Sequence, residues 1–116
     1  MSNKENLGEI KVSNDVLKEL AGFAASECYG VVGMSNPTLR AGVGQILSRD
    51  KLKKGVKVAT ENSKVNFSLY VIVEYGVNMA EVAHNLIQRV KYIVGKYTLL
   101  DVEGVDVYVQ GVKVRK

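Results

Sequence analysis

The sequence contains one cysteine, one proline and no tryptophan, and no apolar run approaches the length of a membrane span. A single cysteine, Cys28, excludes an internal disulfide and any zinc site built from several cysteines. The first twelve residues, MSNKENLGEIKV, lack the apolar centre of a signal peptide. We therefore expect a cytoplasmic protein without a membrane span, which reaches the membrane, if at all, through a partner protein.

Histidine is equally scarce, since His84 is the only one in the chain. It follows a strand-like run and the turn Tyr75-Gly76, a position where some enzymes place a nucleophile, but no GxSxG motif surrounds it. The predicted helix carries His84 outside its apolar face, and no second histidine could share a metal. Cys28 lies near the C-terminal end of another predicted helix, which raises a thiol pKa. We therefore expect no enzyme, no catalytic residue, no metal and no cofactor.

The formal net charge of +4 is concentrated in one segment. Residues 34–55 contain five basic side chains and one acidic side chain, so the rest of the chain is neutral. The segment also holds the only proline, which favours a long loop with a short helix over residues 35–55. Its main basic cluster consists of Arg49, Lys51, Lys53 and Lys54. One basic loop on a neutral domain does not favour a broad nucleic-acid surface.

The first half of the chain predicts a strand followed by a helix. Residues 1–6 are polar and predict disorder, whereas residues 7–12 alternate as a short strand does. Ser13 is a suitable N-cap, and apolar residues then recur at helical spacing until Gly30. Residues 30–34, GVVGM, predict a turn.

The middle of the chain predicts a β-hairpin. Residues 56–58 begin a strand, and Asn62-Ser63 predicts the turn that follows it. Apolar residues then alternate without a break from Val65 to Tyr75, which is the clearest strand pattern in the sequence.

The last third predicts a helix and a final strand. Asn78 and Glu81 have the spacing of a capping box, and the helix after them carries a continuous apolar face that includes Tyr97. Residues 105–109 then alternate as a strand, and Gly111 predicts a bulge or the end of the sheet.

The predicted order is strand, helix, strand, strand, helix, strand. This order predicts one α+β domain over residues 1–116, a two-layer sandwich with a mainly antiparallel sheet and both helices on one face. A chain of 116 residues can bury a hydrophobic core without help from metals or disulfides. A ferredoxin-like path fits, and the order of strands within the sheet stays open.

The polar face of the second helix is the candidate contact surface. It displays seven polar or aromatic residues, namely His84, Asn85, Gln88, Arg89, Lys91, Tyr92 and Lys96. Alternation turns Tyr70 and Tyr108 outward on their strands. Exposed tyrosines and arginines commonly anchor protein–protein contacts. Basic residues with interleaved aromatics also suit single-stranded nucleic acid, which would use this face together with the basic cluster at residues 49–54. Neutrality outside residues 34–55 favours a protein partner.

Three segments resemble a known family: GEIKVSNDVLKELAGFAASECYGVVGM, LYVIVEYGVNMAEVAHNLIQRVKYIV and VEGVDVYVQGVKV. In this order and spacing they are similar to the alkaline-shock, or envelope stress response, family of Gram-positive bacteria, and in particular to its YloU-like branch. The likeness extends from Gly8 to Val114 and is weakest over residues 35–55. One departure is Leu99, where relatives often have a glycine.

The resemblance implies a small cytoplasmic protein without catalytic residues. Relatives are linked to envelope and alkaline stress, to self-association and to attachment at the membrane through an anchor protein. A role near lipid metabolism is also implied, because this branch often accompanies a kinase-like protein of fatty-acid phosphorylation. We therefore expect a homo-oligomeric interaction or scaffold module, with a nucleic-acid-binding module as the alternative.

Overall fold

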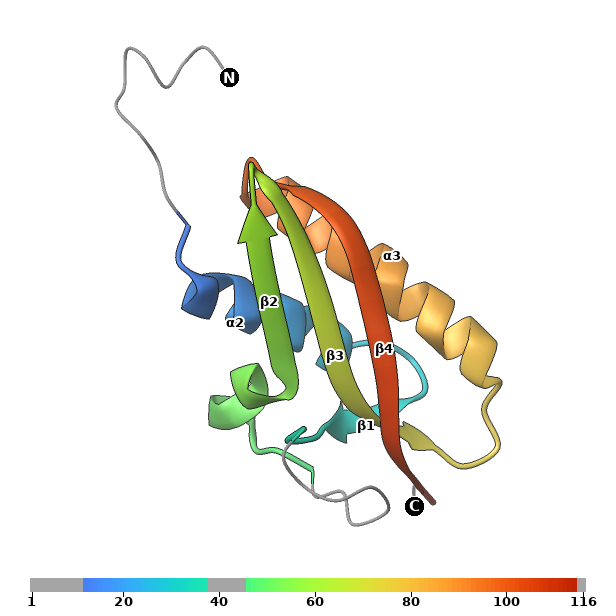
Figure 1. Cartoon of the computed structure of the whole chain (residues 1–116). Helices are drawn as coiled ribbons and strands as arrows, with labels where there is room; N and C mark the ends of the chain where they lie inside the picture. Colours follow the sequence, from blue (N-terminus) through green and yellow to red (C-terminus); the bar gives the residue numbers. More distant parts are fainter. Residues whose placement is uncertain (1–11, 38–45, 115–116) are drawn as a thin grey trace, which may run out of the picture.

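A computed structural model describes residues 12–37 and 46–114 as two layers, a four-stranded sheet and two helices that cover one of its faces (Figure 1). The predicted α+β fold class is confirmed. Residues 1–11, which include the polar end and all but Val12 of the predicted first strand, lie outside the described residues. The elements are α2 (Asn14–Ser26), β1 (Val31–Met34), the 3-10 helix η1 (Arg49–Gly55), β2 (Val56–Glu61), β3 (Lys64–Glu74), α3 (Met79–Tyr97) and β4 (Asp101–Lys113).

β3 is the central strand of the sheet. β4 runs parallel to it along one edge, from the Lys64–Asp101 pair to the Glu74–Lys113 pair. β2 pairs antiparallel with residues 64–69 of β3, and β1 pairs antiparallel with residues 71–73. Because a strand has only two edges, β1 and β2 share the second edge of β3 end to end. The sheet is therefore mainly antiparallel, with one long parallel pair.

The core lies between the sheet and the helices. Alternate residues of β3 are buried, as the sequence pattern predicted: Val65, Phe67, Leu69, Val71 and Val73. The helices pack on these β3 side chains with buried residues at helical spacing, namely Leu17, Ala21 and Ala24 of α2 and Val82, Leu86, Val90 and Val94 of α3. Each large aliphatic side chain buried in this way contributes about 1.5–3 kcal/mol to folding.

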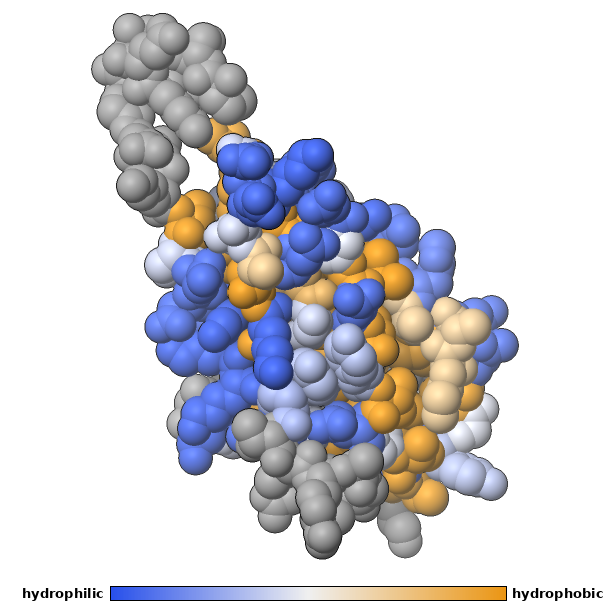
Figure 2. Space-filling view, in the orientation of Figure 1, coloured by the Kyte–Doolittle hydropathy of each residue, from blue (hydrophilic) through white to orange (hydrophobic). Residues whose placement is uncertain are grey.

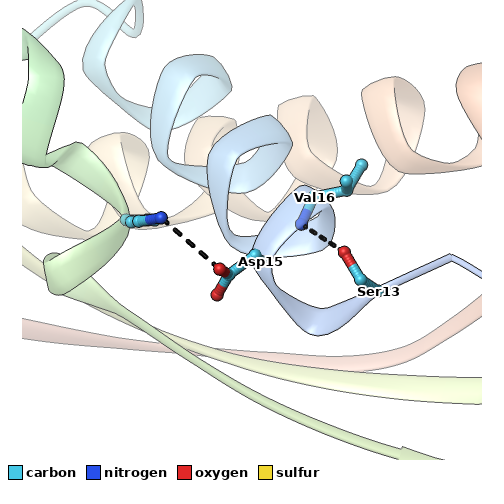
Figure 3. A network of polar contacts seen from close by, with 4 residues as sticks. Ser13, Asp15 and Val16 are labelled. Atoms are coloured by element: carbon cyan, nitrogen blue, oxygen red, sulfur yellow. Dashed lines mark hydrogen bonds and ion pairs between the residues drawn. The ribbon is translucent and has the colours of Figure 1, made fainter.

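Local signals in the sequence place the hairpin and both helix starts correctly. Asn62 and Ser63 have φ of 53° and 66°, the left-handed pair that closes a two-residue hairpin between β2 and β3. Ser13 Oγ accepts a hydrogen bond from the Val16 amide at 3.2 Å, which caps α2 (Figure 3). Asn78 Oδ1 accepts from the Glu81 amide at 3.1 Å and caps α3 in the same way.

Three predicted elements differ from the structure in type or extent. α2 ends at Ser26 instead of continuing to Gly30, and residues 31–34 form strand β1 where the sequence predicted a turn. The glycines explain the turn-like pattern. Gly33 lies so close to Ile46 that a Cβ there would be 2.5 Å from its Cγ2, so the glycine permits packing inside a strand. β4 is also longer than the predicted 105–109, and it has the predicted bulge between Val109 and Gly111.

We predict opposite effects for two glycine-to-alanine changes. Gly30 has φ of +88°, and an added Cβ would lie 2.6 Å from Val82 Cγ2, so Gly30→Ala should destabilise the fold by about 2–4 kcal/mol. Gly95 lies inside α3 with nothing within 4 Å of the added Cβ, so Gly95→Ala should stabilise it by about 0.5–1 kcal/mol. Urea unfolding measures both. A neutral Gly30→Ala variant would contradict the described conformation of this turn.

Candidate interaction surfaces

The outer face of α3 is the first candidate surface, and it is defined by the apolar side of the helix that packs on the core. Val82, Leu86, Val90 and Val94 turn toward the core, so the opposite side of the helix faces solvent. The seven residues predicted for this face are all exposed, namely His84, Asn85, Gln88, Arg89, Lys91, Tyr92 and Lys96. The structure therefore presents the predicted α3 residues together on one helix.

A cluster of aromatic rings around a lysine extends this face toward the C-terminal end of α3. Lys96 Nζ lies 5.7 Å from the ring centre of Tyr92 and 5.5 Å from that of Tyr97. The two tyrosines are 60% and 62% exposed. The sequence pattern placed Tyr97 in the apolar face of the helix, which is wrong, because the helix ends there and no core lies beneath it. Exposed tyrosines next to a cation are typical protein-contact anchors.

The basic cluster lies on η1, at the other flank of α2. Leu52 of η1 packs on α2 at Gly22, where an added Cβ would lie 3.2 Å from the Leu52 carbonyl oxygen. Lys51 and Lys54 are exposed, while Lys53 Nζ lies 3.5 Å from the Asp15 carboxylate in α2 (Figure 3). Such a surface ion pair contributes at most about 1 kcal/mol. The position of Arg49 in η1 is described, but its side chain is not.

The structure does not join the two predicted parts into one surface. η1 packs against α2 and the start of the hairpin, whereas α3 packs against the opposite flank of α2 and against β4 (Figure 1). The Cys28 thiol at the end of α2 lies 3.9 Å from the Asn85 carbonyl oxygen, which locates that contact. A strand of nucleic acid would have to cross α2 to reach both clusters.

The outer face of the sheet is a second candidate surface, because both helices lie on the opposite face. Tyr70 and Tyr108 face outward, as alternation predicted, and their rings stack with centres 4.8 Å apart and planes 11° from parallel. Lys57 Nζ lies 5.7 Å from the Tyr70 ring centre. Asp106 lies in the same cross-strand row as Lys57, so the charges around the stack are mixed. Mixed charge favours a protein over a polyanion.

The two candidate catalytic side chains are His84 and Cys28. The imidazole of His84 is exposed on α3 and has no hydrogen bond or ion pair to any residue in the described ranges. Burial raises the pKa of the Cys28 thiol, which Arg89 opposes and Glu27 reinforces. A raised thiol pKa disfavours the thiolate that a nucleophile needs. Within the same ranges no group of three His, Cys, Asp or Glu side chains could hold a metal.

Comparison with known families covers almost the whole chain. The model of the alkaline shock protein 23 family, described as having a cell envelope-related function, matches residues 2–114. The chain belongs to this alkaline-shock family. Its membership confirms the resemblance seen in the sequence, and the family match spans residues 35–55, where that resemblance is weakest.

Curated relatives in the alkaline-shock family extend over similar lengths. The uncharacterized protein YloU of Bacillus subtilis is 42% identical over 108 residues, which cover 92% of this chain and 90% of that protein. The uncharacterized protein Spy1614 of Streptococcus pyogenes is 34% identical over 108 residues, covering 92% and 89%. No solved structure gives a significant match. In the described part of this alkaline-shock family chain, no helix is both long and apolar enough to span a membrane.

We predict that Cys28 of this alkaline-shock family chain ionises at higher pH in the folded state than in the unfolded state. The pH midpoint of its alkylation by iodoacetamide should therefore fall when the chain is unfolded in urea. Arg89→Met should raise the folded midpoint further and Glu27→Gln should lower it, because Arg89 favours the thiolate and Glu27 opposes it. A folded midpoint below the unfolded one would contradict this environment.

The same shift links Cys28 to stability. The folded chain holds the thiol proton more tightly than the unfolded chain, so this contribution to stability is complete below the unfolded pKa. It is lost as the pH rises through the folded pKa. The Cys28→Ala variant has no thiol to ionise. Its free energy of unfolding should therefore fall less than that of the wild type as the pH rises from the unfolded to the folded pKa of the thiol.

Proposed function

We propose that this chain is a non-enzymatic interaction module of the envelope and alkaline stress response, which self-associates and binds a protein partner. The observation that carries the proposal is the outer face of α3, where Tyr92, Lys96 and Tyr97 form an exposed cation–aromatic cluster beside the exposed Gln88 and Arg89. Rigid, exposed tyrosines on a helix offer large contact area at low entropic cost. The family's cell envelope-related function supports a partner at the envelope.

We place this module in the cytoplasm, at the membrane surface through an anchor protein and near lipid metabolism. The resemblance to alkaline-shock proteins supports this location. The raised pKa of Cys28 and the solvent position of His84 support a role without catalysis.

The test compares two double variants in affinity capture from lysate of the native cell. Gln88→Ala/Tyr92→Ala removes the centre of the α3 face, and Lys51→Ala/Lys54→Ala removes exposed charge from η1 as the matched control. All four positions are exposed, so both variants should fold as the wild type does. We expect the α3 variant to recover at least about tenfold less of an envelope-associated partner than the wild type and the control do, because truncating a contact anchor weakens binding by this order.

Two results would overturn the proposal. Equal recovery of every bound protein by the α3 variant and the wild type would remove α3 as the contact surface. Binding of single-stranded RNA that weakens steeply with salt and is lost in Lys51→Ala/Lys54→Ala would instead establish the nucleic-acid alternative. We expect no such salt-dependent binding, because the basic cluster and α3 are separated by α2.

A further inference from the structure

The outer edge of β4 is the longest unpaired strand edge in the described part of the chain. β4 has 13 residues, and β3 is its single partner among the described strands. An open edge presents N–H and C=O groups that another strand can pair with. Many proteins block such edges with proline or with inward-pointing lysine. β4 contains no proline, and its single lysine is Lys113 at the last position.

The side chains of β4 that face the helix layer are five valines. They pair in register with the buried residues of β3, and they are Val102, Val105, Val107, Val109 and Val112. β4 has one extra residue relative to β3 in two places, before Gly104 and before Gly111. The valines are therefore spaced three, two, two and three residues apart, which makes them symmetric about Val107.

A second copy of β4 can pair antiparallel with the first so that the two Val107 residues lie opposite each other. Valines then lie opposite valines along the whole strand. Val107 then lies opposite its own counterpart, Val105 opposite Val109, and Val102 opposite Val112. All of these pairs point into the helix layer, whereas a shift of one residue would place valines opposite outward-facing residues. The operation is a two-fold axis perpendicular to the sheet, so the contact closes as a dimer.

The charges along β4 fit the same axis. Its first half carries Asp101, Glu103 and Asp106, and its last residue is Lys113. The antiparallel register places Asp101 opposite Lys113 of the second copy, at both ends of the contact. The neighbouring β3 residues extend each row, so that Lys64, Asp101, Lys113 and Glu74 alternate in sign across four strands. A parallel, in-register pairing would instead place like charges side by side.

The surface around this edge is apolar. Val109 and Val112 are 41% and 45% exposed although they face the helix layer. Figure 2 shows hydrophobic residues gathered along the side of the molecule where β4 runs. The Asn85 carbonyl of α3 faces the end of α2, and helical spacing places Ala80, Ala83 and Ile87 on the other flank of α3, which packs against β4. The two alanines leave room there for a second α3 to approach.

We propose that two copies of the chain pair antiparallel through the free edges of β4, about a two-fold axis at Val107. The result is one continuous sheet of eight strands with all helices on the same face. This inference names the self-association surface within the proposed function and rests on it.

The first test is a charge reversal followed by sedimentation equilibrium at low salt. Asp101 and Lys113 lie 12 residues apart on one strand, or about 40 Å, so they cannot meet within one copy. Asp101→Lys should raise the dimer dissociation constant about tenfold, because both ends of the contact then carry like charges. Asp101→Lys/Lys113→Asp should restore dimerisation, although each new residue keeps an unfavourable neighbour within its own chain.

The second test places a lysine in the valine row. Val109→Lys adds an inward-pointing charge to the edge and should weaken the dimer at least about tenfold. Val16→Lys is the matched control, because Val16 of α2 is a comparably exposed valine at 46% and lies away from β4. The control should change the dissociation constant less than twofold.

The third test is directional cross-linking in a Cys28→Ala background. Asp101→Cys and Lys113→Cys, mixed and oxidised, should form a disulfide-linked heterodimer. Neither variant should cross-link to itself, because identical positions lie at opposite ends of the contact.

The outcomes separate this inference from the proposed function. The β4 contact would be overturned if neither the charge reversal nor Val109→Lys changed the dimer dissociation constant. It would also be overturned if either cysteine variant cross-linked to itself. Both results would leave self-association intact. A chain that stays monomeric at all concentrations, with β4 amides protected from hydrogen exchange, would show that a segment of the same chain covers the edge. That result overturns both the inference and the self-association in the proposed function, while binding of a partner through α3 is decided separately by affinity capture.

Discussion

The pairing of β3 on both of its edges is the constraint on which the rest of the structure depends. One edge is used along its whole length by β4, and the other is divided between β2 and β1. The alternate side chains of the same strand form the floor of the core under α2 and α3. β3 therefore fixes both the width of the sheet and the face that the helices cover. Among the described strands, the outer edge of β4 has no partner.

The parallel pairing of β4 with β3 follows from this arrangement. After β3 ends at Glu74, α3 crosses the sheet and returns the chain to the starting end of β3. A helix of 19 residues spans about 28 Å and the 11 residues of β3 span about 36 Å, so the helix and its two connecting segments together return the chain along the strand. β4 can then run the full length of β3 in the same direction. The two bulges in β4 absorb the mismatch between the strands and turn all five valines toward the helices.

Much of the fold could be predicted from local patterns in the sequence. Alternation identified β3, Asn62-Ser63 identified the hairpin, and the caps at Ser13 and Asn78 identified both helix starts. These signals depend on neighbours in the sequence. β1 was missed because Gly30, which forms a real turn before the strand, is followed by Gly33, which lies inside the strand and leaves room for Ile46 at close range. Such contacts join distant segments, so no local pattern reports them.

The same distinction between local patterns and tertiary contacts applies to the candidate surfaces. Helical periodicity alone predicted which α3 residues are exposed, since burial of one stripe determines the opposite one. It could not show that η1 lies across α2 from α3, because that separation is a tertiary fact. Tyr97 was misplaced for a related reason. Periodicity extends the apolar face to the last turn of α3, but the core ends at Val94, one turn earlier.

The three exposed features of the molecule have a geometric relation to one another. An axis perpendicular to the sheet at the β4 edge would keep both helix layers on one side, so two α3 faces would point in the same direction. The two Tyr70–Tyr108 stacks would face the opposite way. A partner that offers two binding sites to such a dimer gains avidity from the second contact without any new interaction. In the proposed dimer, two weak α3 contacts would together give firm attachment, which would link the β4 edge to the outer face of α3.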